Sequence, residues 1–324
     1  MAKAMIIIVN FNAGENLLRC IAALSAQTET DFEARIVDNA STDGSVRYVP
    51  DDDRFLVIHA GSNVGFAAGC NLGARDCAAP FVVMLNPDAF PEPVWLDALL
   101  RAAKSYPDAA MFGSLQINAS DENILDGAGD CYSCFGAPWR GGYGQPVKLL
   151  PDCAEAFSPC AAAAMYRTQW FARMGGFDER FFCFLEDSDL AFRIRLRGGR
   201  CMQVNSAIVH HVGGAASGMK SDFVMYHSAR NRLWTIIKNT PGWLLWVVVL
   251  LHIVFSAYLI FHLRKSSASA LWKGLLAGIA DLPAVWKQRR KIQAARVASI
   301  WDIVRAISWS ITTMHRRDVV LRKW

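Results

Sequence analysis

The sequence predicts an α/β protein: a sheet covered by helices on both faces, followed by C-terminal helices that associate with a membrane. Over the first 115 residues, short apolar runs alternate with helical patterns, as in α/β sheets. Polar residues follow directly behind several apolar runs, at the edge where such sheets bind their ligands. A charge-free stretch at 239–263 precedes a basic tail.

The individual elements follow from periodicity and residue type. Leu17, Leu18, Ile21 and Leu24 recur three or four residues apart, which places them on one face of a helix. The apolar runs predict strands at Met5–Val9, Ala34–Val37, Phe55–Ile58, Phe81–Leu85 and Ala110–Leu115. The helical patterns predict helices at Glu15–Ala26, Ser45–Val49, Phe66–Ala78 and Pro93–Ser105. The first apolar run is too short for a signal peptide and is expected to be a strand.

Residues 118–157 change character and predict an irregular loop over the site. Six glycines interrupt this segment, with Tyr132, Phe135, Trp139 and Tyr143 between them. These aromatic rings either stack on a sugar or hold the loop in place. Regular structure then resumes, with an apolar run at Cys160–Tyr166, helices at Thr168–Met174 and Asp187–Arg197, and strands at Cys201–Val204 and Ala207–Val209.

The C-terminal part differs in charge and hydropathy, which divides the chain into regions 1–235 and 236–324. Residues 264–324 hold 13 Lys and Arg against 3 acids, whereas residues 1–263 hold 21 against 26. Stretch 239–263 is long enough to cross a bilayer, but one crossing would export the basic tail. A re-entrant or interfacial segment on the anionic leaflet is therefore favoured over a buried core helix. Phospholipid is the expected partner of the tail, and nucleic acid is not.

Nine cysteines lie at irregular spacing, which indicates reduced thiols in a cytosolic setting. Cys131 and Cys134 form one CxxC pair, but Cys153 and Cys160 lack the spacing of a second pair. A zinc site is therefore not favoured.

Acidic residues gather at two places in the sequence, one after a predicted strand and one at the start of a predicted helix. Asp88, in Asn86-Pro87-Asp88, comes directly after the strand Phe81–Leu85. Glu186, Asp187 and Asp189 lie together at the start of a helix. One acid can hold a metal while another accepts a proton, although acids at a helix start also simply complement its dipole.

Polar loops follow the first three strands as well. Asn10 and Asn12 follow the first strand, and the run 38–45 follows the second. The glycine-containing segment 61–71 follows the third strand and opens a helix, where backbone N–H groups can receive phosphate. Its spacing matches neither the dinucleotide fingerprint nor a Walker loop.

Six motifs in this order resemble the family 2 inverting glycosyltransferases of GT-A fold, and most closely the rhamnosyltransferase-like enzymes that extend lipid-linked saccharides. The resemblance covers about residues 5–235 and implies a Rossmann-like mixed sheet. The motifs lie at 10–12, 37–45, 63–71, 85–88, 175–182 and 186–193.

The resemblance also implies roles for individual residues. Asn10 and Asn12 would line the nucleotide pocket, Asp38 would contact the base, and Asp43 would support that loop. The floor under the ribose and diphosphate would be formed by Asn63, Gly65 and Asn71. Asp88 matches the last position of the family's Asp-x-Asp metal motif, and Asn86 replaces the first acid, which puts strict metal dependence in question.

Catalytic roles follow from the same resemblance. Asp187 matches the general base, and Glu186 and Asp189 would orient the acceptor or Asp187 itself. His211, rather than its neighbour His210, is expected to face the site and help to bind Mg²⁺ or Mn²⁺. Residues 230–232, Arg-Asn-Arg, either meet the diphosphate of a lipid-linked acceptor or are ordinary interfacial residues.

The expected function is transfer of a hexose, with L-rhamnose as one candidate, from a nucleoside-diphosphate sugar to a lipid-linked or cell-envelope glycan. The expected location is the cytoplasmic face of the plasma membrane. A nucleotidyltransferase is an alternative, but it needs a basic glycine-rich loop, and residues 10–20 hold only Arg19. A non-catalytic membrane scaffold is a second alternative, which the acids at 88 and 187 disfavour.

Overall fold

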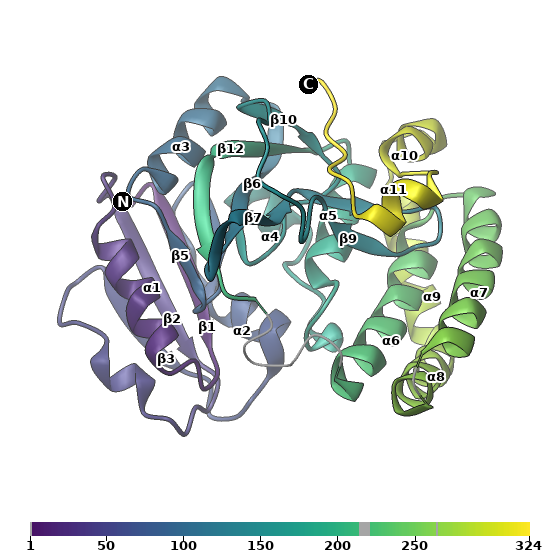
Figure 1. Ribbon diagram of the computed structural model, residues 1–324, viewed down its shortest axis with the longest axis horizontal. Helices are drawn as coiled ribbons and strands as arrows, with labels where there is room; N and C mark the ends of the chain where they lie inside the picture. Colours follow the sequence, from purple (N-terminus) through teal and green to yellow (C-terminus); the bar gives the residue numbers. More distant parts are fainter. Residues whose placement is uncertain (1, 214–220, 264) are drawn as a thin grey trace.

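The protein forms one large mixed sheet with helices on both faces and a group of C-terminal helices at one end (Figure 1). The computed structural model describes residues 2–213, 221–263 and 265–324. The strand order is β10-β12-β6-β11-β4-β1-β2-β3, with β5 on β12 and β7 on β6. The strands are β1 (Ala4–Asn10), β2 (Phe32–Asp38), β3 (Phe55–His59), β4 (Phe81–Leu85), β5 (Ala89–Pro91), β6 (Ala109–Asn118), β7 (Asp121–Ala128), β10 (Cys153–Ala156), β11 (Ala163–Arg167) and β12 (Arg200–His211).

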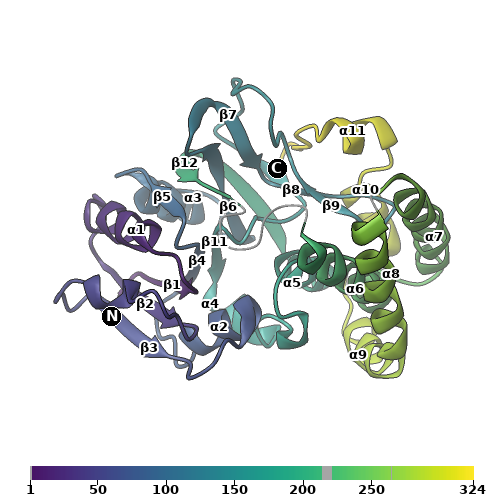
Figure 2. The same ribbon diagram turned by 60° about the horizontal axis from the view of Figure 1, so that its bottom comes forward.

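Strand β1 shows why both faces of the sheet are covered. All seven of its residues are buried. Ile6 and Ile8 pack into the core under α1 and α3, whereas Ile7 and Val9 pack into the core on the opposite face, with α2, α4 and α5. Figure 2 shows α1 and α3 on one side of the sheet and α2 on the other. These helices are α1 (Glu15–Ser25), α2 (Gly65–Gly73), α3 (Trp95–Ser105), α4 (Thr168–Arg173) and α5 (Glu186–Leu196).

The prediction of an irregular loop at 118–157 is wrong. Strand β7 pairs antiparallel with β6, and β10 pairs antiparallel with β12. Between them, β8 (Asp130–Tyr132) and β9 (Pro138–Arg140) form a small hairpin. Glycines with positive φ, such as Gly129 and Gly136, lie at the turns rather than throughout a loop. The two strands predicted at 201–204 and 207–209 are one strand, β12, with an irregularity between Val204 and Ile208.

The C-terminal helices pack against one another and against the sheet domain. They are α6 (Asp222–Asn239), α7 (Leu244–His262), α8 (Lys265–Ala280), α9 (Leu282–Ala294), α10 (Ile300–Ala306) and α11 (Ile311–Arg316). Residue 235, where the two predicted regions meet, lies inside α6. One core cluster joins Tyr132 and Phe192 of the sheet domain to Trp234 and Val248 of these helices. The two regions therefore share a helix and a core.

The last residues return to the sheet domain (Figure 1). Arg322 exchanges backbone hydrogen bonds with Glu155 of β10, and Gly142 donates its N–H to the carbonyl of Arg317. The Trp324 ring lies 3.9 Å from the guanidinium carbon of Arg200. The C-terminal segment thus covers the strands of region 121–156 from outside.

A buried ion cluster joins α6 to α5. The Lys238 ammonium, whose side chain is 1% exposed, lies 2.6 Å from an Asp178 oxygen and 2.9 Å from an Asp189 oxygen. Asp189 also accepts a hydrogen bond from Arg193, at 2.8 Å. Arg180 forms a further ion pair with Asp178, at 2.8 Å. Lys238 is the buried cation that the two carboxylates share, so its loss would leave both with less compensating charge.

Replacing Lys238 by Met should therefore lower the free energy of unfolding by about 3–5 kcal/mol, because it leaves buried carboxylate charge without compensation. Urea titration followed by circular dichroism measures the change. The exposed Lys104→Met on α3 is the control and should stay within about 0.5 kcal/mol of the wild type. Equal stability of the Lys238 and Lys104 variants would contradict the structural role of this cluster.

Candidate active site

Polar side chains from neighbouring parallel strands meet at one edge of the sheet. Asn10 at the end of β1 pairs in register with Asp38 at the end of β2. Strand β4, on the other side of β1, ends at Leu85 and leads directly into Asn86 and Asp88. The carboxyl ends of parallel strands are where open α/β sheets place ligands, so this edge is the candidate site.

The first two loops at this edge are joined by side-chain hydrogen bonds. The Asn10 amide donates to the hydroxyls of Ser41 and Ser45, both at 3.0 Å. Asn12 accepts from the Thr42 N–H at 2.8 Å, and Asp43 accepts from the Gly14 N–H at 2.8 Å. Asp43 thus supports its loop, and Asn10 and Asn12 hold the two loops in one arrangement.

Asp38 lies inside this arrangement. Its carboxylate accepts a hydrogen bond from the Ser41 N–H at 3.1 Å and lies 3.2 Å from Nδ1 of the exposed His59. The side chain itself is only 10% exposed. Asp38 is therefore a largely buried carboxylate at the end of β2, bonded within the second of these loops.

The glycine-containing segment is already occupied by protein groups, so the phosphate-binding role expected for it is not supported. Asn63 accepts from the Gly65 N–H at 3.0 Å, and the Ala67 N–H donates to the carbonyl of Phe182. A Cβ on Gly65, which has φ +84°, would lie 2.6 Å from the Phe182 oxygen. Gly65 is therefore needed for close approach of the Phe182 loop.

Asn71 likewise holds a neighbouring turn in place. Its amide donates to the Phe177 carbonyl at 2.9 Å, and its oxygen accepts from the Phe177 N–H at 2.9 Å. The same amide lies 3.0 Å from a Glu179 oxygen. These contacts use the polar atoms of Asn71 within the protein and place the turn at 175–179 beside α2.

A chain of charged groups runs from Asp88 into the β7–β9 region. His211 Nε2 lies 3.3 Å from Asp88, and His211 Nδ1 lies 2.7 Å from Asp126. Arg140 forms an ion pair with the same Asp126 oxygen, Oδ2, that His211 contacts. His211 faces Asp88 because it lies opposite Ala89 in the β12–β5 pairing, whereas His210 turns to Glu92.

These contacts change the acidity of both groups. Burial alone lowers the pKa of His211, but its hydrogen bonds to Asp126 and Asp88 outweigh burial and raise that pKa to about 9. Burial raises the pKa of Asp88, and the bond to His211 brings it below its usual value. In the metal-free protein, Asp88 and His211 therefore form an ion pair at neutral pH.

Asp187 is held at the start of α5 by backbone amides. Its carboxylate accepts from the Ala161 N–H at 3.0 Å and from its neighbour Ser188 at 2.6 Å. The next residue, Ala162, accepts a hydrogen bond from the Asn86 N–H at 2.9 Å. The segment 160–162 therefore lies between Asp187 and the turn that carries Asp88.

The environment of Asp187 favours its protonated form. Burial raises the pKa of the Asp187 carboxyl above its usual value, although the amides of Ala161 and Ser188 partly oppose this. A carboxylate with a raised pKa is a stronger proton acceptor once it is ionised, which is what a general base requires.

The segment before α5 is strained. Phe182, Phe184 and Leu185 have φ of +65°, +69° and +66°, a conformation that side chains with a Cβ rarely adopt. The Asn231 amide of α6 lies 2.8–3.0 Å from three carbonyl oxygens in this segment, those of Phe181, Cys183 and Phe184. The surrounding structure thus enforces the strained backbone, as is common beside functional sites.

The other two acids of this motif differ from Asp187. Asp189 is completely buried and bound to Arg193, Lys238 and the Asn239 amide, so its expected role in orienting the acceptor is not supported. Two residues along a helix correspond to about 200°, which turns Asp189 away from Asp187. Glu186 is buried, with its Oε2 unpaired among the described groups, and burial raises its pKa well above its usual value.

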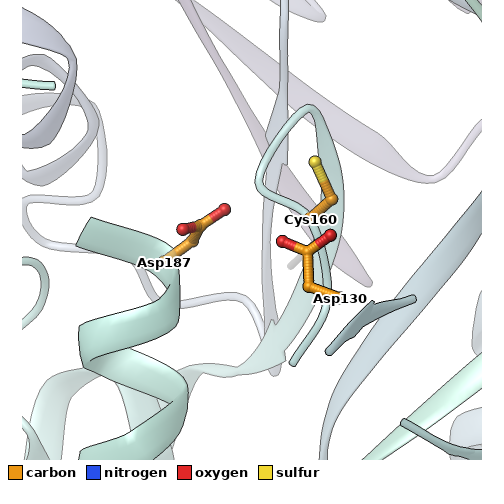
Figure 3. Close-up of side chains that lie close together, drawn as sticks. All are labelled: Asp130, Cys160 and Asp187. Atoms are coloured by element: carbon orange, nitrogen blue, oxygen red, sulfur yellow. The ribbon is translucent and has the colours of Figure 1, made fainter. Parts of the chain in front are cut away.

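Asp187 is one of three potential metal ligands that lie close together (Figure 3). Ligand atoms of Asp130, Cys160 and Asp187 lie within 4.8 Å of one another. Asp130 is buried, and its Oδ1 has no partner in the described structure. Burial, with a smaller contribution from Asp187, raises the pKa of Asp130 well above its usual value, and burial does the same for the Cys160 thiol. A cation here would have to displace both protons.

Sequence reasoning missed Asp126, Asp130 and Arg140. All three lie in the segment that was expected to be a loop, where local periodicity is weak. The aromatic rings of that segment face the protein, which disfavours their use for sugar stacking. Tyr132 stacks on Phe157, Phe135 packs against Phe255, the Trp139 indole donates to Asp318, and Tyr143 lies between Arg140 and Arg317.

The sequence of this chain is similar to those of known proteins. The pattern of "Glycosyl transferase family 2" matches residues 5–175, which include β1, β2, β4 and the site loops between them. The chain belongs to this glycosyltransferase family. It is 28% identical over 264 residues to the N-acetylglucosaminyl-diphospho-decaprenol L-rhamnosyltransferase of Mycobacterium tuberculosis, covering 74% of this chain and 85% of the relative.

Solved structures agree on the fold of this family 2 glycosyltransferase. GalNAc-T7, in a complex with UDP, GalNAc and Mn²⁺, aligns with 98% of this chain and 58% of its own at a TM-score of 0.65 and 14% identity. S. aureus TarS 1–349 aligns at a TM-score of 0.59 and 14% identity, over 90% and 83% of the two chains. The mannosyltransferase PcManGT of Pyrobaculum calidifontis aligns at 0.55 and 14% identity, over 94% and 86%. The predicted GT-A fold is thereby confirmed.

Asp130→Asn should show how strongly the buried carboxyl resists ionisation. Since the pKa of Asp130 is raised on folding, the folded state binds the proton more tightly, and stability falls as pH rises above about 4. Relative to the variant, the wild type should lose about 1.4 kcal/mol for each unit of pKa shift between pH 4 and pH 7. Urea titrations in EDTA at both pH values measure this, with the exposed Asp53→Asn as control. A difference that does not change with pH would contradict the assignment.

Proposed function

We propose that this protein transfers a hexose from a nucleoside-diphosphate sugar to a hydroxyl of a lipid-linked glycan, with inversion at the anomeric carbon. The observation that carries the proposal is the position of segment 160–162. It binds the Asp187 carboxylate through Ala161 and the Asn86 turn through Ala162. A proton acceptor and a diphosphate-side carboxylate on either side of one short segment suit displacement of a diphosphate by a hydroxyl.

The donor is assigned to the loops that follow the first two strands. Asp38 would accept a hydrogen bond from the base, with Asn10, Asn12 and Asp43 keeping these two loops in place. Asn63, Gly65 and Asn71 make hydrogen bonds within the protein and would support this region rather than bind the diphosphate directly. Asn86 is joined by its N–H to segment 160–162, which also binds Asp187.

Asp88, His211 and Asn86 fit a divalent cation. A carboxylate oxygen, an amide oxygen and an imidazole nitrogen are ligands that suit Mn²⁺, and oxygen ligands suit Mg²⁺. The Asn86 amide nitrogen lies 3.4 Å and an Asp88 oxygen 3.3 Å from His211 Nε2, so rotation of the Asn86 amide would turn its oxygen toward the same point. Asp126 holds the opposite ring nitrogen, an arrangement typical of metal-binding histidines. When bound, such a cation stabilises negative charge on a leaving diphosphate.

Asp187 is assigned as the general base that acts on the acceptor hydroxyl. Its ionised carboxylate would take the proton of the acceptor hydroxyl as that oxygen attacks the anomeric carbon from the face opposite the diphosphate. Burial raises the pKa of Glu186 well above its usual value, whereas the amides of Ala161 and Ser188 partly oppose the rise in the pKa of Asp187, so Asp187 is assigned as the proton acceptor. The strained segment 182–185 sets the direction from which α5 presents Asp187.

Asp187→Asn should reduce the turnover number by about 10²–10⁴-fold, because the amide cannot accept the proton. Nucleotide affinity should stay within about twofold, since the amide oxygen can still accept the Ala161 N–H and hold segment 160–162. Release of nucleoside diphosphate from a panel of nucleotide sugars, with Mn²⁺ and a lipid-linked acceptor, measures turnover. Isothermal titration with the nucleoside diphosphate measures binding.

The exposed Glu122→Gln on β7 is the matched control and should retain full turnover. NMR of the product should show the opposite anomeric configuration from the donor sugar. Retained turnover of the Asp187 variant would refute the base assignment, and a retained configuration would refute inversion.

The outer face of α7 is assigned as the surface that contacts the membrane, on the cytoplasmic side of the plasma membrane. This helix is long and apolar enough to cross a bilayer by length and composition. One face, with Leu244, Val248 and His252, packs against the protein, while Trp246, Leu250, Val254 and Phe261 are 59–85% exposed. A one-sided apolar face beside a basic tail favours a helix that lies in the interface of an anionic membrane.

Leu250→Glu combined with Val254→Glu should release the protein from anionic vesicles. Two charges on the apolar face oppose insertion, so the bound fraction in a flotation assay with phosphatidylglycerol vesicles should fall at least about tenfold. The control is Leu56→Glu, an exposed leucine on β3 at the far end of the molecule (Figure 1). Equal binding of the double variant and the control would place the membrane contact elsewhere.

A further inference from the structure

The three polar residues near the middle of α6 differ in what they contact. Arg230 donates to the carbonyls of Arg180 and Phe181, both at 3.0 Å. Asn231 is bound to the strained segment before α5. Arg232 makes no hydrogen bond and no ion pair within the described structure. Its guanidinium carbon lies 5.2 Å from the centre of the Phe255 ring, and its Nε is buried without a partner.

Among the described residues, no acidic group pairs with Arg232. The residue is 9% exposed, and burial lowers its pKa to about 10. Close by, Nδ1 of His252 lies 3.1 Å from the Phe135 carbonyl, and burial together with Arg232 lowers the pKa of His252 to about 3, so this ring is neutral. A buried cation without an acid is costly, and proteins normally compensate such a charge with a partner.

A second unpartnered polar group lies beside this arginine. The Tyr132 hydroxyl is buried in a residue that is 2% exposed, and it has no hydrogen-bond partner among the described residues. Arg232 is the main charged group acting on it, and Tyr132 is the one acting on Arg232. Two buried polar groups without partners among the described residues, one from β8 and one from α6, therefore lie within electrostatic range of one another.

The position of this pair links the two sites already described. Tyr132 follows Asp130, a neighbour of Asp187, by two residues along β8. Arg232 lies against Phe255, which belongs to α7 with its exposed apolar face. Phe135 and Phe255 are only half-buried, so the pair lies about one side chain below the surface.

We propose that Arg232 and Tyr132 bind the diphosphate group of the lipid-linked acceptor, between the general base Asp187 and the membrane-facing helix α7. This inference rests on the proposed function. A guanidinium binds phosphate oxygens in a bidentate manner, and a phenol donates one further hydrogen bond. The diphosphate of the ligand supplies the negative counter-charge for Arg232. The polyprenyl chain of the ligand then continues along α7 into the bilayer.

Binding of four probes to the protein tests the proposal. Farnesyl diphosphate carries both the diphosphate and a short polyprenyl chain, farnesol lacks the diphosphate, and inorganic diphosphate and UDP lack the chain. Arg232→Gln should weaken farnesyl diphosphate about 10- to 100-fold and Tyr132→Phe about 3- to 10-fold, in line with loss of hydrogen bonds to a charged group. Arg232→Lys should restore part of the affinity, and the exposed Arg305→Gln is the control.

A stability measurement separates binding from a structural role. Because Arg232 has no protein partner to leave unsatisfied, Arg232→Met should melt at the same temperature as the ligand-free wild type or higher. Farnesyl diphosphate should raise the melting temperature of the wild type but not of this variant. A lower melting temperature together with unchanged affinity would make Arg232 a structural residue and overturn the proposal.

The remaining outcomes are equally decisive. If inorganic diphosphate or UDP binds as tightly as farnesyl diphosphate and loses as much affinity in Arg232→Gln, the site binds a free or donor diphosphate, and the lipid assignment fails. If the wild type transfers sugar and Arg232→Gln keeps its KM for the lipid acceptor, the inference fails while the proposed function stands. If the wild type releases nucleoside diphosphate from no donor sugar, the proposed function itself fails, whatever the probes bind.

Discussion

The hydrogen bond from the Ala161 N–H to the Asp187 carboxylate determines how the two halves of the site meet. It joins the start of α5 to the segment that precedes β11, and the neighbouring Ala162 joins that segment to the turn after β4. Strand β11 is antiparallel to both of its neighbours, β4 and β6, so its start lies at the edge where β4 ends. A single reversed strand therefore brings α5 to the polar edge of the parallel strands.

Burial at this edge is compensated in different ways for different groups. Asp88, His211, Asp126 and Arg140 alternate in charge, so each buried ion has an opposite neighbour. For Asp130 and Glu186, burial is the largest effect and raises the pKa of both carboxyls well above the usual value. Asp187 differs from both groups, since burial raises its pKa while the amides of Ala161 and Ser188 lower it.

The C-terminal helices also support the candidate site. Asn231 holds the strained segment before α5, and Lys238 compensates the acids behind it. The C-terminal segment covers the strands that supply Asp126 and Arg140. Contact with a membrane through α7 would thus act on helices that directly support Asp187. Of the α6 residues 230–232, only Arg232 has a side chain without a polar partner in the described structure. It lies against Phe255 of α7.

The sequence alone was sufficient for the parallel strands, the helices over them and the polar residues at their ends. Alternating and helical periodicities are local properties, and Asn10, Asp38 and Asp88 follow their strands directly. Asp126, Asp130 and Arg140 could not be placed in this way, because β7–β10 are held by pairing with distant strands and their short, glycine-interrupted pattern carries little periodicity. The tertiary structure also decided which polar side chains are satisfied by the protein, as Asn71 and Asp189 are, and which remain unpaired, since hydrogen-bond partners distant in sequence are fixed only by packing.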